Sequence, residues 1–368
     1  MGRFIRSVAA AIALAVALAV VAVSGQQPQQ QPQALVLPGN TLSILENYLE
    51  SLRQQAGIPG MSGTVLLNQT VVWEKGFGFQ DVENHIAATP DTPYLIGDMS
   101  QTVAAVLLLE CVEQRRFALD DPFSTFGLSA PESTATARQL LSHASSDPAK
   151  NGFFYSPGRF DNLTALMEWC APQPYRKSVA HRILDRLAMT DSVPGTDLQD
   201  PDLQLPDGFF TPDELAGYRA QLAKTAVPYK LDARGHATRG TMPALPMTAA
   251  NGLVSTVRDL ANFDKALDGE ILLQDDTRTQ AWTPGLTPAG TPMPTGLGWF
   301  VQYYHGEKIV WHFGYVPNAY SALLLKIPDR NLTFILLANS DGLSAPFQLS
   351  LGDVTRSLFA TLFLKLAT

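Results

Sequence analysis

The sequence predicts an α+β fold, in which an antiparallel sheet is flanked by helices and joined to a second, mostly helical lobe. The order of elements is the first observation behind this prediction. A helix and a strand hairpin open the chain, a helical region follows, and four strand-like runs and a helix close it. The second observation is segment 102–112, which is apolar on all sides and therefore predicts a central helix that is buried all round.

The first elements follow from local patterns. Leucines at positions 42, 45, 49 and 52 recur at spacings of three and four, which predicts a helix that begins near Asn40. Gly57 and Pro59 end that helix. Two strand-like runs follow at 62–67 and 71–79, and residues 68–70 between them predict a hairpin.

The middle of the chain predicts a helical lobe, at about 96–249. Beyond the central helix, helical stretches are expected at 137–141, 163–169 and 179–187. Residues 193–247 are rich in Pro and Asp and show little periodicity, so we expect a loop-rich insertion or lid there.

The C-terminal part predicts a return to the sheet. Strands are expected at 296–303, 308–312, 319–327 and 332–338, with a hairpin turn at 328–331 and a final amphipathic helix over 349–366. The sheet lobe would therefore combine about 39–95 with about 250–368, because both ends of the chain contribute strands.

The N-terminus has the pattern of a secretory signal peptide over residues 1–25. Arg3 and Arg6 precede an apolar run from Val8 to Val23, and Ala22-Val23-Ser24 offers a cleavage site. Residues 26–38 form a tether rich in Gln and Pro. We therefore expect a protein that is exported, periplasmic or secreted. The alternative is membrane anchoring through this segment if it stays uncleaved.

Composition excludes several functions. The 26 Lys and Arg against 34 Asp and Glu give a net charge of -8, so the basic footprint of a nucleic-acid-binding protein is absent. We expect no metal, because the six His residues lack metal-binding spacings, and no cofactor, because the sequence has no phosphate loop and no Gly-x-Gly-x-x-Gly motif. Cys111 and Cys170 both lie in apolar helical segments. We expect them to be free and buried, with one disulfide as the alternative in an exported protein.

Seven short segments, in this order along the chain, carry a resemblance to the serine β-lactamase and penicillin-binding-protein superfamily, in its class C β-lactamase-like branch. They are Gly57-Ile58-Pro59-Gly60, Val71-Val72-Trp73-Glu74-Lys75-Gly76-Phe77-Gly78, Leu140-Leu141-Ser142-His143, Leu187-Ala188-Met189-Thr190-Asp191, Asn251-Gly252-Leu253-Val254-Ser255-Thr256, Gly296-Leu297-Gly298-Trp299 and His312-Phe313-Gly314. The resemblance implies a β-lactamase/transpeptidase-like domain over residues 39–368. It also implies acyl transfer by a Ser-x-x-Lys dyad at the start of the central helix.

That dyad is missing from the sequence. In the matching stretch Asp98 stands at the nucleophile position and Gln101 at the lysine position. None of the nine lysines has a serine three residues upstream, so the dyad has not moved elsewhere. Asp-x-x-Gln at a helix start is close to a capping box, and we therefore expect Asp98 and Gln101 to cap the helix instead of catalysing. The alternative keeps Asp98 as an acid/base group.

The resemblance also implies a Tyr-x-Asn element, for which two placements compete. Tyr155-Ser156-Pro157 keeps the tyrosine and fits the spacing without a gap, whereas Phe160-Asp161-Asn162 keeps only the asparagine. We prefer the first placement. In the third family element, His312 and Gly314 match the His-x-Gly of the strand that lines the cleft. Tyr155, His312 and Gly314 are therefore the predicted ligand-binding residues.

These substitutions predict a pseudoenzyme, an inactive or impaired serine-hydrolase homologue that binds a peptide or a peptidoglycan-like ligand in the family cleft. One alternative is an esterase- or peptidase-type hydrolase that uses Asp98, Tyr155 and His312 around a bound water. Another is a structural envelope protein whose cleft is filled by residues 193–247.

Overall fold

The computed structural model describes residues 39–129, 134–145, 152–171, 173–287 and 289–368. The predicted signal peptide, 1–25, and the tether, 26–38, lie outside the described residues. Within the described residues, no helix is both long and apolar enough to cross a membrane.

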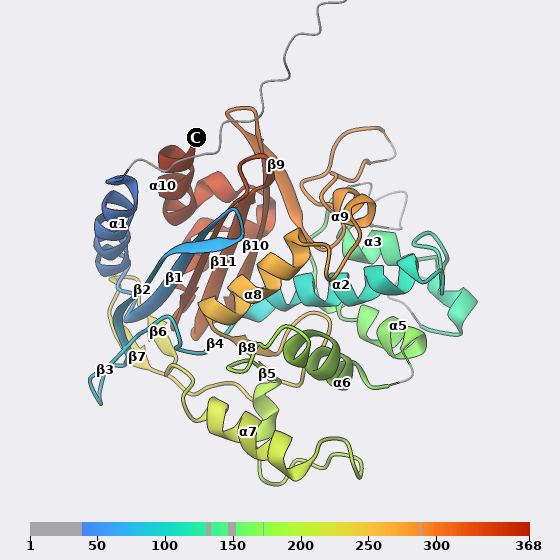
Figure 1. Ribbon diagram of the computed structural model, residues 1–368, viewed down its shortest axis with the longest axis horizontal. Coiled ribbons are helices and arrows are strands. Elements are labelled where there is room, and N and C mark those ends of the chain that lie inside the picture. The colour runs from blue at the N-terminus through green and yellow to red at the C-terminus, as the bar shows by residue number, and fades with distance from the viewer. Residues whose placement is uncertain (1–38, 130–133, 146–151, 172, 288) are drawn as a thin grey trace, which may run out of the picture. The chain divides into compact units, whose positions relative to one another are not determined.

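A seven-stranded antiparallel sheet forms the centre of the domain, in the order β3-β2-β1-β12-β11-β10-β9 (Figure 1). Both ends of the chain build it, as predicted, since β1 pairs with β12. The strands are β1 Gly60–Leu67, β2 Thr70–Asp81, β3 Ile86–Ala87, β9 Phe300–Tyr304, β10 Glu307–Val316, β11 Tyr320–Ile327 and β12 Leu332–Ala338. The predicted β1–β2 hairpin is confirmed, and its turn residues Asn68 and Gln69 both have positive φ, as tight hairpin turns require.

Helices cover both faces of this sheet. The terminal helices α1 (Thr41–Gln55) and α10 (Leu358–Ala367) pack together, and α1 also contacts β2. Helix α8 (Val257–Asp268) packs on β1 and β12 from the other side (Figure 1). The predicted start of the last helix was wrong. Residues 345–356 form short 3₁₀ turns, and Ser357 then caps α10 by accepting a hydrogen bond from the Ala360 amide.

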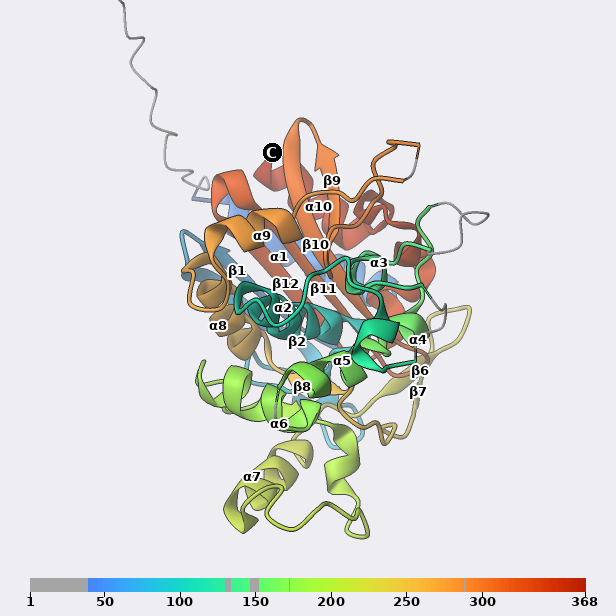
Figure 2. The same ribbon diagram turned by 90° about the vertical axis from the view of Figure 1, so that its right-hand side faces the viewer.

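The central helix α2 (Ser100–Glu113) confirms the prediction from its apolar run, because every side chain from Ser100 to Cys111 is buried. The helical region around it contains α3 Ala137–Leu141, α4 Pro157–Phe160, α5 Leu163–Cys170, α6 Tyr175–Val179 and α7 Pro212–Leu222, while α9 Asp275–Ala281 lies beyond α8 in the chain. Helices α6 and α7 lie on the side of α2 away from α9 (Figures 1 and 2).

The expectation of free cysteines was wrong. Cys111 of α2 and Cys170 of α5 form a disulfide, with their Cα atoms 6.4 Å apart. The two helices pack against each other, which brings apolar positions 59 residues apart into contact. The bond ties the central helix to the helical region.

Residues 193–247 contain more regular structure than predicted. They include helix α7 and the hairpin of β6 (Tyr229–Leu231) and β7 (Ala237–Arg239). A capping box between Thr211 and Glu214 starts α7, with Pro212 in its first turn. The segment begins in a small sheet in which β5 (Val193–Pro194) and β4 (Tyr94–Leu95) both pair with β8 (Leu253–Ser255). That sheet connects the two predicted lobes, whose boundaries stay a prediction.

Candidate functional site

The segment that carries Asp98 lies directly on strand β10. It forms the 3₁₀ turn Gly97–Met99 immediately before α2. Gly97 has φ +57, and a Cβ there would lie 2.7 Å from the Tyr315 backbone nitrogen. A Cβ at Gly314 would overlap the Ile96 carbonyl oxygen. Both glycines therefore allow the two backbones to touch, which fixes the start of α2 against the strand. Gly314 has a packing role here, and its predicted ligand contact stays a prediction.

The predicted capping box is absent. Neither the 3₁₀ turn nor α2 has a side-chain cap at its start, and Asp98 makes no hydrogen bond to the amides of its own helix. The Asp98 carboxyl instead lies beside the Tyr155 hydroxyl, which donates toward it and lowers its pKa. Gln101 also turns toward that tyrosine, with Nε2 3.4 Å from Oη. The two residues at the missing dyad positions are thus joined through Tyr155.

These contacts extend into a directed chain of hydrogen bonds. The Ser156 amide donates to Nδ1 of His143 at 3.1 Å. Because Nδ1 accepts, a neutral His143 carries its proton on Nε2 and donates it to Oε1 of Gln101, 2.9 Å away. The Gln101 side-chain amide then donates to the Tyr155 hydroxyl oxygen, and the Tyr155 hydroxyl proton points to the Asp98 carboxyl. The chain begins at a backbone amide and ends at a carboxyl group, so the direction of each bond is set.

Burial sets the protonation of these groups. Asp98 is 6% exposed, and loss of hydration raises its pKa to about 7, against the hydrogen bond from Tyr155, which lowers it. Burial also lowers the pKa of His143 well below its usual range, helped by the nearby His312 and Arg159. Burial lowers the pKa of His312 to about 4, although the hydrogen bond to the Phe313 carbonyl opposes this. Both histidines are therefore neutral at neutral pH, and Asp98 is the group of this network that titrates there.

A cavity of about 360 Å³ opens beside this network. Asp98, Tyr155 and Pro157 line it together with two neighbours on β10, Phe313 and Tyr315. The remaining described lining residues come from the turns after β12: Ser344, Ala345, Gln348, Leu349 and Ser350. No lining residue comes from 193–247, so this segment does not fill the cavity as the structural alternative requires.

The predicted site residues divide between the cavity and the packing around it. Asp98 and Tyr155 line the cavity. His312 does not line it, because side chains alternate along a strand and its neighbours Phe313 and Tyr315 face the cavity instead. His312 is 1% exposed, and its Nδ1 donates to the Phe313 carbonyl at 2.8 Å. Gln101 is fully buried behind Tyr155.

The geometry favours the first placement of the Tyr-x-Asn element. In the second placement, Phe160 is fully buried and stacks on His143, with ring centroids 5.3 Å apart. Asn162 donates to the carbonyls of Gly158 and Arg159, within its own turn of chain. Neither Phe160 nor Asn162 lines the cavity, whereas Tyr155 does.

Sequence reasoning assigned no role to His143, Phe313 or Tyr315, or to the turns at 344–350. His143 stands in a motif that was used only as a sign of the fold. His143 stands between two buried leucines and an aromatic cluster, and this position was the signal that the sequence offered. A buried imidazole needs hydrogen-bond partners. The helix expected over 349–366 covered Leu349 and Ser350, whereas Ser344, Ala345 and Gln348 belonged to no expected element.

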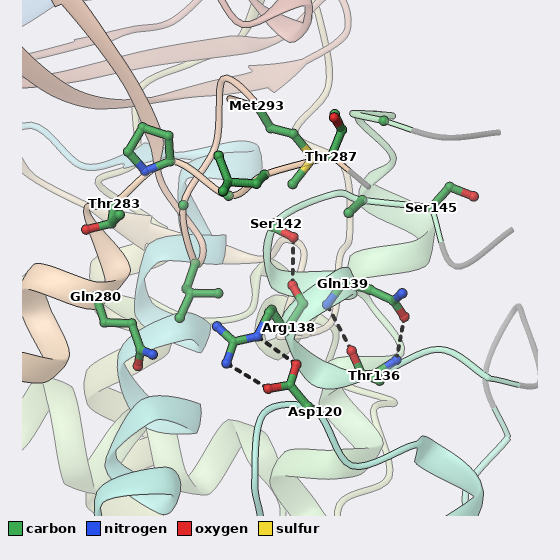
Figure 3. Close-up of a pocket in the computed structure, with 17 residues that line it drawn as sticks. Asp120, Thr136, Arg138, Gln139, Ser142, Ser145, Gln280, Thr283, Thr287 and Met293 are labelled. Carbon is green, nitrogen blue, oxygen red and sulfur yellow. Dashed lines mark hydrogen bonds and ion pairs between the residues drawn. The ribbon is translucent and has the colours of Figure 1, made fainter. Parts of the chain in front are cut away.

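A second, larger cavity of about 530 Å³ lies beside α3 (Figure 3). Its charged groups are paired with each other, because Arg138 donates two hydrogen bonds to Asp120, at 2.7 and 2.9 Å. Thr136 and Gln139 form the capping box of α3. None of the predicted site residues lines this cavity. Its charged side chains are paired and none of the predicted site residues lies in its wall, and we therefore place the candidate site at the smaller cavity.

One group of described side chains has ligand atoms close enough to hold a metal ion, although the sequence predicts no metal site. It consists of His181, Asp185 and Glu214, with these atoms within 4.8 Å of one another. A hydrogen bond of 2.7 Å between His181 and Asp185 and the capping contact of Glu214 with Thr211 account for their positions. The group lies outside the candidate site, and its residues do not line the smaller cavity.

Fold and motifs together define a serine β-lactamase or penicillin-binding-protein fold. Residues 45–351 match the sequence model described as Beta-lactamase, and the chain belongs to this family. Protein flp of Staphylococcus aureus is 22% identical over 352 residues, which cover 82% of this chain and 64% of that protein. The putative penicillin-binding protein PbpX of Bacillus subtilis is 23% identical, covering 70% of this chain and 64% of that protein. This chain thus spans 64% of the length of these curated relatives.

Solved structures agree on the fold. The octameric penicillin-binding protein homologue from Pyrococcus abyssi superimposes with a TM-score of 0.69 at 23% identity. The match covers 88% of this chain and 77% of that chain. At this identity the likeness establishes the architecture, and the chemistry of the site depends on the residues described above.

Proposed function

We propose that this protein is a non-acylating member of the β-lactamase family that binds a small ligand in the family cavity. The observation that carries the proposal is the Asp98 carboxyl group, which stands where the family nucleophile is expected and is hydrogen-bonded to Tyr155 at the cavity wall. A carboxylate attacking an amide or ester would give an anhydride, which is a poor intermediate.

The remaining hydroxyl groups do not replace the nucleophile. Ser100 is fully buried, and its hydroxyl accepts a hydrogen bond from the Leu253 amide. Ser344 lines the cavity, but its hydroxyl donates to the Gly314 carbonyl at 2.8 Å. Ser350 also lines the cavity. Among the described residues, no Lys or His side chain is hydrogen-bonded to any of these three serines, so none of them has the adjacent base that activates a nucleophile.

The cavity supports ligand binding. Its volume of about 360 Å³ lies in the range of small-molecule sites, about 300–1,000 Å³, and a few polar groups stand among aromatic walls, as is typical of such sites. The ligand class that the family suggests is a peptide or a peptidoglycan fragment. With the signal-like segment 1–25, the proposal places this binding in the cell envelope or outside the cell.

Fluorescent penicillin tests the absence of acylation. Incubation of the purified protein should give no covalent fluorescent band on a denaturing gel, while a penicillin-binding protein labelled in parallel does. A band on this protein that disappears in Asp98→Ala would overturn the proposal. Export is tested separately: expression of the full chain should yield protein outside the cytoplasm without the apolar N-terminal segment, and cytoplasmic, full-length protein would contradict it.

A second candidate function is hydrolysis by acid/base chemistry around a bound water. The hydrogen bond between Asp98 and Tyr155 and the pKa of Asp98 at about 7 favour it, because a general base works best with a pKa near the working pH. Turnover of a chromogenic ester should then be lost in Asp98→Asn and retained in His312→Ala, since His312 does not line the cavity. Absence of turnover by the wild-type protein would exclude this candidate.

A further inference from the structure

The charge of the candidate cavity is unusual for a site that would hold an acidic ligand. Asp98 is the one residue with a carboxyl side chain among the described lining residues, and none of those residues is Lys, Arg or His. Three aromatic side chains stand around it: Tyr155, Phe313 and Tyr315. The Tyr155 and Phe313 rings lie 5.3 Å apart between centroids, so they form a continuous aromatic wall.

Asp98 has no cationic partner among the described residues. It takes part in no ion pair there, and its hydrogen-bond partner is the neutral hydroxyl of Tyr155. The charged groups that act on Tyr315, on the same wall, are Asp98 and Asp341, both carboxyl groups. A buried carboxylate without a counter-ion is costly, and a cation beside it offsets that cost.

We propose that the ligand of this cavity carries a positively charged nitrogen, as an organic ammonium with an apolar body. The Asp98 carboxylate attracts the charge, and the faces of aromatic rings favour cations over neutral groups of the same shape. A ligand whose head group is a carboxylate would meet Asp98 with a like charge and without a basic residue in the lining. This inference rests on the proposed ligand-binding function and specifies its chemistry.

Three probes with one apolar body and different head groups separate charge from shape: 3-phenylpropylamine, 3-phenylpropanol and 3-phenylpropionate. Calorimetric titration of the full chain at mildly alkaline pH compares their dissociation constants. The amine should bind about tenfold more tightly than the alcohol or better, and the carboxylate more weakly than the alcohol. Asp98→Asn, which keeps the shape of the side chain, should bring the amine to the level of the alcohol.

The matched control is Asp207→Asn. Asp207 is exposed, lies outside the cavity lining and makes no hydrogen bond or ion pair with a described residue, so the preference for the amine should stay unchanged. Equal binding of the three probes would overturn the inference and leave a ligand-binding cavity. Binding of none of them at millimolar concentration would also overturn the inference. The proposed non-acylating function is judged independently, by the fluorescent penicillin band.

Discussion

Replacement of Asp98 by Asn should stabilise the protein at neutral and alkaline pH. The carboxyl group is buried, and its pKa is about 7 in the folded chain against the usual 3.8. Between these two pH values the folded state binds a proton that the unfolded state has lost, so the stability of the wild-type protein falls as pH rises through this window. Below the lower value both states are protonated, and this cost disappears.

The size of the effect follows from the same two values. A difference of one pKa unit corresponds to about 1.36 kcal/mol, so the interval between 3.8 and about 7 gives about 4 kcal/mol as an upper estimate. Asn keeps the shape of Asp and can still accept the hydrogen bond from Tyr155, while it carries no charge at any pH. The free energy of unfolding of the variant, relative to that of the wild-type protein, should therefore rise steadily with pH across the window and stay constant above it.

Urea unfolding of both proteins at a series of pH values measures this difference directly, because contributions from distant titrating groups cancel when the two free energies of unfolding are subtracted. Asp207→Asn serves as the control and should follow the wild-type curve, because Asp207 is exposed. A difference between Asp98→Asn and wild type that is independent of pH, or that favours the wild type as pH rises, would refute the burial argument.

Two further substitutions and one chemical reduction test the packing of the domain. Gly314→Ala would place a methyl group on a backbone carbonyl oxygen of the segment before α2, and chemical denaturation should show a loss of about 3 kcal/mol; a loss near zero would contradict the close approach. Reduction of the Cys111–Cys170 disulfide, which closes a loop of 59 residues, should lower stability by about 4 kcal/mol, seen as a lower thermal midpoint; an unchanged midpoint would contradict it. Lys326→Met should cost about 3–5 kcal/mol in urea unfolding, because it removes the cation 2.5 Å from the buried Asp264; a gain in stability would show that the ion pair is dispensable.

Local patterns predicted much of the fold. The leucine spacing of α1, the turn at Asn68 and the all-apolar stretch of α2 each depend on neighbouring residues, and all three were confirmed. The order of the elements along the chain predicted that strands from both chain ends share one sheet. The last helix was placed too early because apolar residues before Ser357 continue a helical spacing, although the backbone there forms 3₁₀ turns.

The site depended on contacts that local patterns do not contain. A capping box for Asp98 and Gln101 was a sound local interpretation, but Tyr155, 54 residues beyond Gln101, is the partner of both. The disulfide likewise needs the packing of α2 on α5. The resemblance predicts which catalytic residues are missing. The hydrogen-bond chain through Asp98 and Gln101 became visible only when distant segments were brought together.

Intact-protein mass spectrometry after prolonged incubation with benzylpenicillin tests the central claim most directly, since it detects an acyl group on any side chain. We predict a single mass, that of the unmodified chain, because the cavity holds the Asp98 carboxyl group beside Tyr155, and neither serine among its described lining residues has an adjacent base. A stoichiometric increase by the mass of the penicillin, mapped to a residue that lines this cavity, would contradict the claim.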